Sequence, residues 1–258
     1  MKFINDILKI ISDYGMTYLK GAGNTLLLAL IGTVAGCIIG FIVGTVQATP
    51  LPEQKGKRVL MQIVRAILRG YVELFRGTPM IAQAVFVYYG VFYLGGTTTA
   101  WAASMFVVSI NTGAYMAETV RGGIMSIDNG QFEGAKAIGM THNQTMIHVV
   151  LPQALRNIIP QIGNNFIINI KDTSVMSIIS FVDLFNVHKS VVGSNYMFFP
   201  SIVLTLAIYL TMTVVSSILL RKWEDKMAGD ANYDIVNTKD TLAQTSGLYR
   251  AKKKEADR

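Results

Sequence analysis

Charged and amide side chains occur inside an otherwise apolar stretch of the sequence, residues 161–182. On a helix, positions i, i+4 and i+7 share a face, and Asn165, Asn169 and Asp172 have this spacing. Asn164 and Lys171 form the adjacent stripe. An ionisable group at bilayer depth costs on the order of 2.5 to 3.5 kcal/mol. We therefore expect these residues to avoid lipid and to line a polar path or a contact between subunits.

A second polar stripe with the same spacing lies earlier in the chain and consists of Asn111, Tyr115 and Glu118. A bound amino acid needs an anion for its ammonium group and a cation or a helix N-terminus for its carboxylate. The two stripes together hold both signs of charge, so they predict a translocation path for such a molecule. The alternative is a network of Lys171 and Asp172 that only joins the helices.

A polar segment, residues 128–160, separates the two stripes and contains signals for two short helices. Asp128 and Gln131 have capping-box spacing, which predicts that a helix begins there. Gly139 is a suitable end for that helix, because glycine tolerates a left-handed conformation. The segment is therefore expected to fold as a helix, a tight glycine turn and a second helix.

The second helix of this segment has its own capping signal in Thr141 and Gln144. We expect it to reach Leu151. Pro152 should then begin a new segment, since proline lacks an amide donor and suits a first helical turn.

The composition points to a membrane protein. Of 258 residues, 51% are hydrophobic and only 15% are charged, which exceeds what one soluble core of this length would use. The net charge of +7 would suggest nucleic acid as a partner of a soluble protein, but here the basic residues flank apolar stretches and are better explained as topology signals. No nucleic-acid partner is expected.

Apolar stretches predict an all-α, polytopic membrane fold with about five transmembrane helices. The expected spans are residues 24–47, 80–95, 99–117, 161–182 and 199–220. Residues 1–20 alternate charged and apolar residues, which predicts an amphipathic helix on the membrane surface and is too interrupted for a signal peptide. The membrane domain is thus expected over 21–222, followed by a charged, flexible cytoplasmic tail, 223–258.

Small residues recur every fourth position in the first span, at Gly32, Gly36, Gly40 and Gly44. Such a flat face allows close helix packing. A dimer interface and packing within the subunit both remain possible at this point.

Lysines and arginines give the orientation, because they accumulate on the cytoplasmic side. Residues 49–78 hold six of them, 118–160 hold three and the tail from Arg221 holds nine, so 18 of 23 lie on one side. The N-terminus is therefore expected outside and the C-terminus in the cytoplasm.

At the start of the second span, Thr78 is expected to cap the helix and Pro79 to occupy its first turn. Arg76, just before them, is expected to reach toward the membrane edge.

The single cysteine, Cys37, excludes an internal disulfide and a cysteine metal cluster. The three histidines are scattered without metal-ligand spacing. No glycine-rich phosphate loop of the Walker type occurs, so no cofactor is expected in this chain.

Five residues of the polar segment stand in an informative order: Glu133, Ala135, Gly139, Leu151 and Pro152. This order resembles the EAA loop of bacterial ABC importer permeases, in which Glu-Ala-Ala is followed by three residues, glycine, nine residues, isoleucine, any residue and Leu-Pro. Two positions depart from that pattern, Gly134 in place of alanine and Val149 in place of isoleucine. Gly134 should weaken its helix by roughly 1 kcal/mol relative to alanine.

The resemblance extends to four collinear blocks, residues 71–83, 114–127, 139–160 and 171–179, which look like the polar amino acid subfamily, the histidine and glutamine permease type. It implies a permease subunit of an importer in the bacterial plasma (inner) membrane. It also implies that the loop docks on a cytoplasmic ATPase. The docking residues implied are Glu133, Ala135, Gly139, Thr141, Gln144, Leu151 and Pro152.

The resemblance further implies the partners. These are an ABC ATPase dimer that binds ATP and Mg²⁺, a second permease subunit that is identical or a paralogue, an extracytoplasmic substrate-binding protein and membrane lipid. The chain itself is then a transporter subunit and not an enzyme. The implied substrate is a polar amino acid such as glutamine, arginine or histidine, and Glu118 and Asp172 favour a basic one.

Two other classes of protein would use some of the same features. A secondary transporter or channel would use intramembrane charges with an ion gradient, but we find no inverted repeat and the loop would have no task. A membrane scaffold would use the loop to bind a partner, but it would not need the polar stripes.

Overall fold

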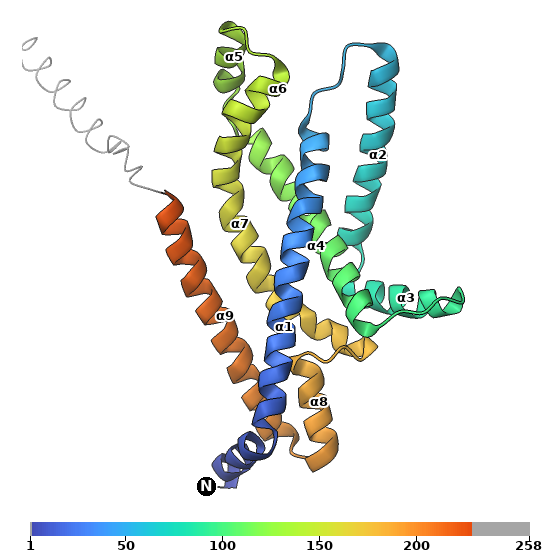
Figure 1. Cartoon of the computed structure of the whole chain (residues 1–258), viewed down its shortest axis with the longest axis vertical. Coiled ribbons are helices and arrows are strands. Elements are labelled where there is room, and N and C mark those ends of the chain that lie inside the picture. The colour runs from blue at the N-terminus through green and yellow to red at the C-terminus, as the bar shows by residue number, and fades with distance from the viewer. Residues whose placement is uncertain (1, 229–258) are drawn as a thin grey trace, which may run out of the picture. The chain divides into compact units, whose positions relative to one another are not determined.

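The computed structural model describes residues 2–228, and every regular element among them is helical (Figure 1). This confirms the predicted all-α class. The part of the chain up to Leu220 is one compact unit, and Arg221 begins a second unit. The elements are α1 (Lys2–Ala48), α2 (Lys55–Gly77), α3 (Met80–Tyr93), α4 (Ala100–Met125), α5 (Asn129–Ala137), α6 (His142–Thr145), the π-helix η1 (Met146–Val150), α7 (Leu151–Asp172), the 3-10 helix η2 (Thr173–Ile179), α8 (Leu184–Asn195) and α9 (Phe198–Ala228). The predicted tail lies largely outside the described residues.

Helices α1 and α4 pack closely along the stripe of glycines. A Cβ atom added to Gly36 would lie 2.6 Å from the Cβ of Thr112 and 3.0 Å from the backbone nitrogen of Gly113. The other glycines of the stripe, Gly32, Gly40 and Gly44, meet Val108, Met116 and Val120 of α4 in the same way. The two backbones therefore approach each other as closely as small residues allow, and the stripe is used within the subunit.

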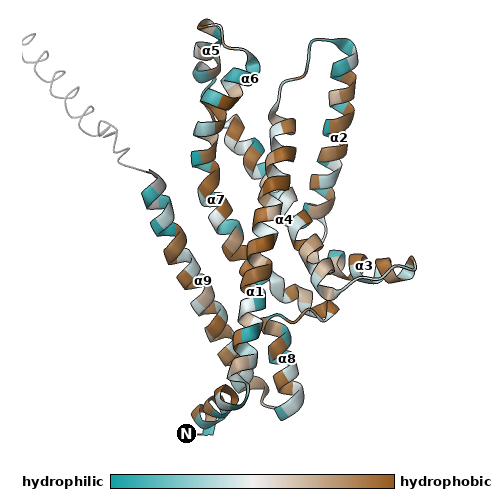
Figure 2. Cartoon of the chain, viewed as in Figure 1, coloured by the Kyte–Doolittle hydropathy of each residue, from teal (hydrophilic) through white to brown (hydrophobic). Residues whose placement is uncertain are grey.

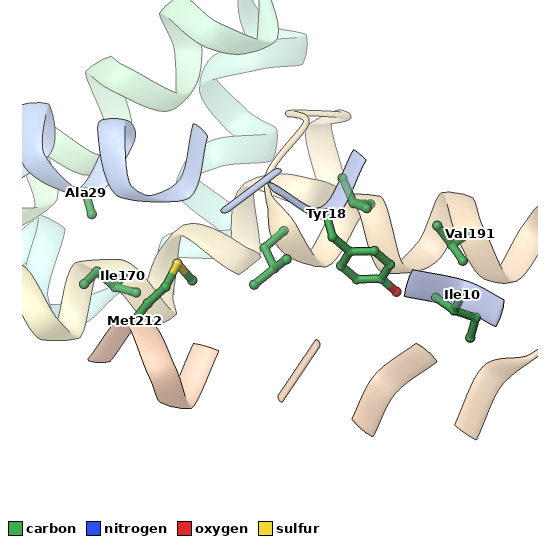
Figure 3. Packing of buried hydrophobic residues seen from close by; sticks show 8 residues of the cluster. Ile10, Tyr18, Ala29, Ile170, Val191 and Met212 are labelled. Atoms are coloured by element: carbon green, nitrogen blue, oxygen red, sulfur yellow. The ribbon is translucent and has the colours of Figure 1, made fainter. Parts of the chain in front are cut away.

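Residues 2–20 are helical, and their expected place on the membrane surface stays a prediction. They continue without a break into α1, although its first turns lie at an angle to the rest (Figure 1). Ile10 and Tyr18 are fully buried in a cluster with Leu184 and Val191 of α8 and Met212 of α9 (Figure 3). These contacts account for only part of the amphipathic pattern, because Ile4, Leu8, Met16 and Leu19 are each more than half exposed.

The basic segment 49–78, for which no helix was predicted, is mostly helical. It forms α2, a 23-residue helix that packs on α4. At 100° per residue, Arg65, Arg69 and Arg76 fall on one face of α2. The opposite face carries large exposed apolar side chains, Leu60, Ile63, Ile67 and Leu74. The arginines thus belong to the inner face of an amphipathic helix. Their number alone does not reveal this helix, because it takes no account of their spacing.

The expected spans differ from the observed helices in length and continuity. Among the described residues, two helices, α1 and α9, are long and apolar enough to cross a bilayer by themselves, and Figure 2 shows the apolar residues along them. Helix α3 has 14 residues, roughly 21 Å at 1.5 Å per residue, which is shorter than the hydrocarbon core of about 30 Å. The expected second span is therefore too short to cross alone.

The expected fourth span, 161–182, is a broken one. Its helix α7 begins ten residues earlier, at Leu151, and gives way to the 3-10 helix η2 after Asp172. The chain then turns at Ser180, whose φ is 61°. The helices on either side of this break are bent by 49°, and they pass the length and hydropathy criteria for a span only when taken together.

Helix α1 holds this break in place. The side chain of Asn24 donates to the carbonyl of Val182 at 2.8 Å, and the hydroxyl of Thr25 accepts from the amide of Leu184 at 3.0 Å. Both contacts satisfy backbone groups that a broken helix leaves without partners.

The close packing of α1 on α4 predicts a large effect for one glycine of α1 and a small effect for another. Gly36→Val must displace Thr112 and the α4 backbone, so we expect a loss of about 1–3 kcal/mol in the free energy of unfolding. Gly23→Val is the control, because an added Cβ there meets no atom within 4 Å. Thermal unfolding in detergent measures both, and equal midpoints for the two variants would contradict the packing.

Candidate functional site

A cavity of about 490 Å³ opens where the end of α2 and the start of α3 meet α4 and α7. This volume falls within the range of about 300–1,000 Å³ that is usual for small-molecule sites. We call it the amide cavity, because three asparagines contribute to it. Its lining residues are Arg76, Gly77, Thr78, Pro79, Met80, Asn111, Thr112, Tyr115, Asn165, Ile168, Asn169 and Asp172.

The structure brings both predicted polar stripes to this cavity but not all of their residues. Asn111 and Tyr115 line it from α4, and Asn165, Asn169 and Asp172 line it from α7. The three other predicted residues do not line it. Asn164 and Lys171 are exposed on α7, and Glu118 belongs to a neighbouring cavity.

Asn169 joins three helices by hydrogen bonds. Its side-chain nitrogen donates to the hydroxyl of Thr33 on α1 at 2.8 Å, and its side-chain oxygen accepts from Thr112 on α4 at 3.2 Å. The hydroxyl of Thr33 in turn donates to the carbonyl of Ala29 at 2.7 Å. Asn169 is only 5% exposed, so its polar atoms are committed to holding α1, α4 and α7 together.

Asn111 is part of a second network that fixes the end of α2. Its side-chain nitrogen donates to the carbonyl of Phe75 at 3.0 Å and to the Oε1 atom of Gln83 at 3.1 Å. Gln83 donates from Nε2 to the carbonyls of Phe75 and Thr78, at 2.9 and 3.0 Å. These bonds satisfy the carbonyl groups left open at the end of α2.

Gln83 was missed by the sequence analysis, although an amide side chain in an uncharged apolar stretch is a usable signal. The expected cap at Thr78 is wrong as well. Pro79 occupies the N-cap position of α3, and no side chain caps this helix. Thr78 instead accepts a hydrogen bond from Gln83 at 2.9 Å.

Arg76 forms an ion pair with Glu118, and its guanidinium carbon lies 5.3 Å from the centre of the Tyr115 ring. Both charged side chains are more than a third exposed, so the pair contributes on the order of 0–1 kcal/mol to stability. Arg76 was not predicted to lie here. It brings a cation to a cavity that Asp172 lines from the opposite helix, and Asp172 forms no ion pair with another described residue.

The polar segment 128–160 forms the predicted helical hairpin. Thr141 and Gln144 make the capping box, in which the amide of Thr141 donates to the side chain of Gln144 at 2.8 Å. Gly139 adopts the left-handed conformation, with φ of 80°. Asp128 caps α5, but its carboxylate accepts from the amide of Gly130 at 2.6 Å and Gln131 takes no part in the cap.

The second helix of the hairpin was expected to end at Leu151, but it continues past this residue. The chain passes from α6 through the π-helix η1 directly into α7. In η1 the amide of Leu151 donates to the carbonyl of Met146, five residues earlier. This widened turn lets Pro152, which has no amide hydrogen, follow without breaking the helix.

The hairpin residues separate into buried and exposed ones. Ala135 is only 5% exposed, and Met146 and Val150 pack against α4. Glu133, Gly139, Thr141 and Gln144 are exposed. Two large apolar side chains, Ile138 and Ile147, are 78% and 59% exposed in the same hairpin. We call the exposed residues from Glu133 to Ile147 the hairpin face. Leu151 and Pro152 lie beyond it, at the start of α7.

No group of three or more His, Cys, Asp or Glu side chains that could hold a metal ion occurs within residues 2–228. The amide cavity offers amides, hydroxyls and the two charges of Arg76 and Asp172.

The chain is similar to proteins of one transport family. The family described as "Binding-protein-dependent transport system inner membrane component" matches residues 36–228. The probable amino-acid ABC transporter permease protein y4tG of Sinorhizobium fredii is 32% identical over 217 residues, which cover 81% of this chain and 93% of that protein. The glutamine transport system permease protein GlnP of Escherichia coli K12 is 30% identical over 211 residues, 81% of this chain and 92% of GlnP.

Solved structures agree with this similarity. The crystal structure of an amino acid ABC transporter with histidines contains a chain that is 31% identical, with a TM-score of 0.76, over 85% of this chain and 98% of the other. An inward-facing structure of the MetNI methionine ABC transporter has a TM-score of 0.62 at 18% identity, over 80% of this chain and 96% of the other, and shows the shared fold.

Two glycines of the hairpin should respond oppositely to the same substitution. Gly139→Ala places a side chain at φ of 80°, which we expect to cost about 1–2 kcal/mol. Gly134→Ala, in the helical part with no atom within 4 Å of the added Cβ, should stabilise α5 by about 1 kcal/mol. Hydrogen exchange of the amides of residues 129–145 measures both effects, and faster exchange in Gly134→Ala than in Gly139→Ala would contradict the hairpin geometry.

Proposed function

We propose that this chain, which belongs to the binding-protein-dependent transport system inner membrane components and is a permease subunit of an amino-acid ABC transporter, carries a polar amino acid into the cell using ATP hydrolysed by a partner chain. The permease subunit itself is not an enzyme. The observation that carries the proposal is the amide cavity, where charges of both signs meet hydrogen-bonding groups between four helices.

The amide cavity fits an amino acid better than an inorganic ion. Asp172 offers a carboxylate to the ammonium group, and Arg76 offers a guanidinium to the carboxylate when it separates from Glu118. Asn165 and the Tyr115 hydroxyl add hydrogen-bonding groups beside them. Glutamine, or a basic amino acid such as arginine or histidine, would use all of these partners.

The hairpin face is the proposed docking site for an ABC ATPase that binds ATP and Mg²⁺. Its apolar side chains, Ile138 and Ile147, are exposed in the part of the chain that the structure describes, and a groove on a partner would cover them. Docking there would place the hairpin in the cytoplasm, the N-terminus outside and the C-terminus inside. The complete importer would contain two ATPases, a second permease subunit and an extracytoplasmic binding protein.

The surrounding lipid would cover the outer surfaces of the spanning helices. Large apolar side chains of α9, among them Leu206, Leu210 and Val215, are half or more exposed in the chain. Such exposed apolar side chains are expected of a multi-pass protein of the bacterial plasma (inner) membrane.

The docking proposal predicts loss of the ATPase from one hairpin variant. In Ile138→Asp a charge replaces an exposed apolar contact, so the ATPase should no longer co-purify with the tagged permease, and ATP-driven uptake of the amino acid into proteoliposomes should fall at least tenfold. Asn129→Asp is the matched control: it adds the same charge at the start of α5, where a negative charge is favourable, and should retain both.

Two results would contradict this assignment. If Ile138→Asp retains the ATPase, the docking site lies elsewhere. If uptake by the wild-type complex continues without ATP and follows an ion gradient, the protein works as a secondary transporter or channel.

The cavity proposal predicts different effects for neighbouring charges on α7. Asp172→Asn removes the anion of the amide cavity and should raise the KM about tenfold or more for glutamine and for a basic amino acid alike, since both carry the ammonium group that Asp172 would bind. Lys171→Gln alters a charge that does not line the cavity and should change KM less than twofold. Equal losses in the two variants would mean that the polar stripe acts as a whole and that the cavity does not define the site.

A further inference from the structure

A second cavity, of about 340 Å³, lies between the end of α1, the middle of α2 and α4. We call it the arginine cavity, because Arg65 and Arg69 of α2 and Arg121 of α4 all line it. Glu73 of α2 and Glu118 of α4 complete its charged lining. It was not predicted from the sequence, where the α2 arginines served only to indicate orientation.

The cations of this cavity form no ion pair within residues 2–228. None of Arg65, Arg69 and Arg121 forms an ion pair with a described residue, whereas Glu118 is paired with Arg76. The Nε atom of Arg65 and the Nε2 atom of Gln47 are buried without a hydrogen-bond partner within the described part of the chain. Buried donors without partners are unfavourable. Because Glu118 is paired with Arg76, Glu73 is the one remaining carboxylate of the lining for three arginines, and an anionic group in the cavity would offset the excess of positive charge and satisfy the donors.

The ion pair of Arg76 and Glu118 connects the arginine cavity to the amide cavity. Arg76 lines the amide cavity and Glu118 lines the arginine cavity. On α4 the residues Asn111, Tyr115, Glu118 and Arg121 follow one another at a spacing of three or four, so they form one continuous polar stripe past both cavities. The pair therefore stands between two polar spaces along the same helix.

We propose that the arginine cavity is a second subsite of the translocation path, which binds the carboxylate of the amino acid through Arg65 and Arg69 after the ion pair of Arg76 and Glu118 opens. This inference rests on the proposed transport function. Glu73 and the released Glu118 would hold the ammonium group. Carboxylates in the lining favour a zwitterion over the phosphate of an acidic lipid, which they would repel.

The test counts bound amino acids on the complex of permease and ATPase in nanodiscs of phosphatidylcholine, without the binding protein. Radiolabelled substrate should saturate at two molecules per permease chain in the wild type. In Arg65→Gln/Arg69→Gln it should saturate at one. Arg58→Gln is the matched control, because Arg58 is exposed on the same helix and lines neither cavity, and it should keep two.

A charge-preserving variant separates binding from folding. Arg65→Lys/Arg69→Lys retains both cations without the planar, two-pronged guanidinium, so it should keep two molecules, with the second bound several-fold more weakly. If the lysine and glutamine variants both lose the second molecule to the same extent while their unfolding midpoints fall together, the arginines act on the structure and the proposal is overturned.

Two further results distinguish the proposals. In the first, the wild type shows ATP-driven uptake but binds only one molecule per chain, and Arg65→Gln/Arg69→Gln gives the same uptake and the same count. This result overturns the second subsite and leaves the transport function intact. Absence of ATP-driven uptake in the wild type overturns the transport function itself. An acidic lipid that native mass spectrometry finds on the wild type and not on the glutamine variant, with the amino acid count unchanged, would make the cavity a lipid site and overturn the second subsite.

Discussion

The close contact of α1 with α4 is the constraint on which the rest of this structure depends. Gly36 and the other glycines of the stripe place no side chains in the contact surface. The two helix backbones therefore come into direct van der Waals contact. In a bilayer there is little hydrophobic gain from bringing helices together, so this shape match and interhelical hydrogen bonds must hold them. Helices α2, α3 and α7 then pack on α4, and both cavities lie along it.

Polar residues in this chain have two different tasks, which their burial separates. Asn169 and Gln83 are buried, and their amides satisfy groups on neighbouring helices. Asp172, Tyr115 and Arg76 are more exposed and border a space large enough for a ligand. Asn169 thus joins helices, whereas Lys171 and Asp172, the pair expected to form a joining network, are both exposed, and the path along the stripes stays a prediction.

The sequence allowed the local features to be predicted and left the tertiary ones open. The capping box of Thr141 and the turn at Gly139 depend on residues within one or two helical turns, so their spacing was sufficient. The glycine stripe packs on another helix, and the sequence of α1 alone does not identify which one. Helix α2 was missed because charges at a helical period look like a polar loop when only their number is considered. The break at Ser180 carries no glycine and is fixed by Asn24 and Thr25, far away in sequence.

Continuity of α7 with the hairpin gives a physical route between the two proposed sites. From Leu151 to Asp172 the helix spans roughly 33 Å at 1.5 Å per residue, and η1 joins it to the hairpin without a loop. Gln153 bonds back to Gln131 at 3.1 Å, so α5 and the start of α7 are tied together. A partner that displaces the hairpin therefore also displaces α7, while the Thr33–Asn169–Thr112 contacts resist the movement on the far side. Because Asp172 lies one turn beyond Asn169, a shift or rotation of α7 about these contacts changes the distance between Asp172 and Arg76, the two charges that border the amide cavity.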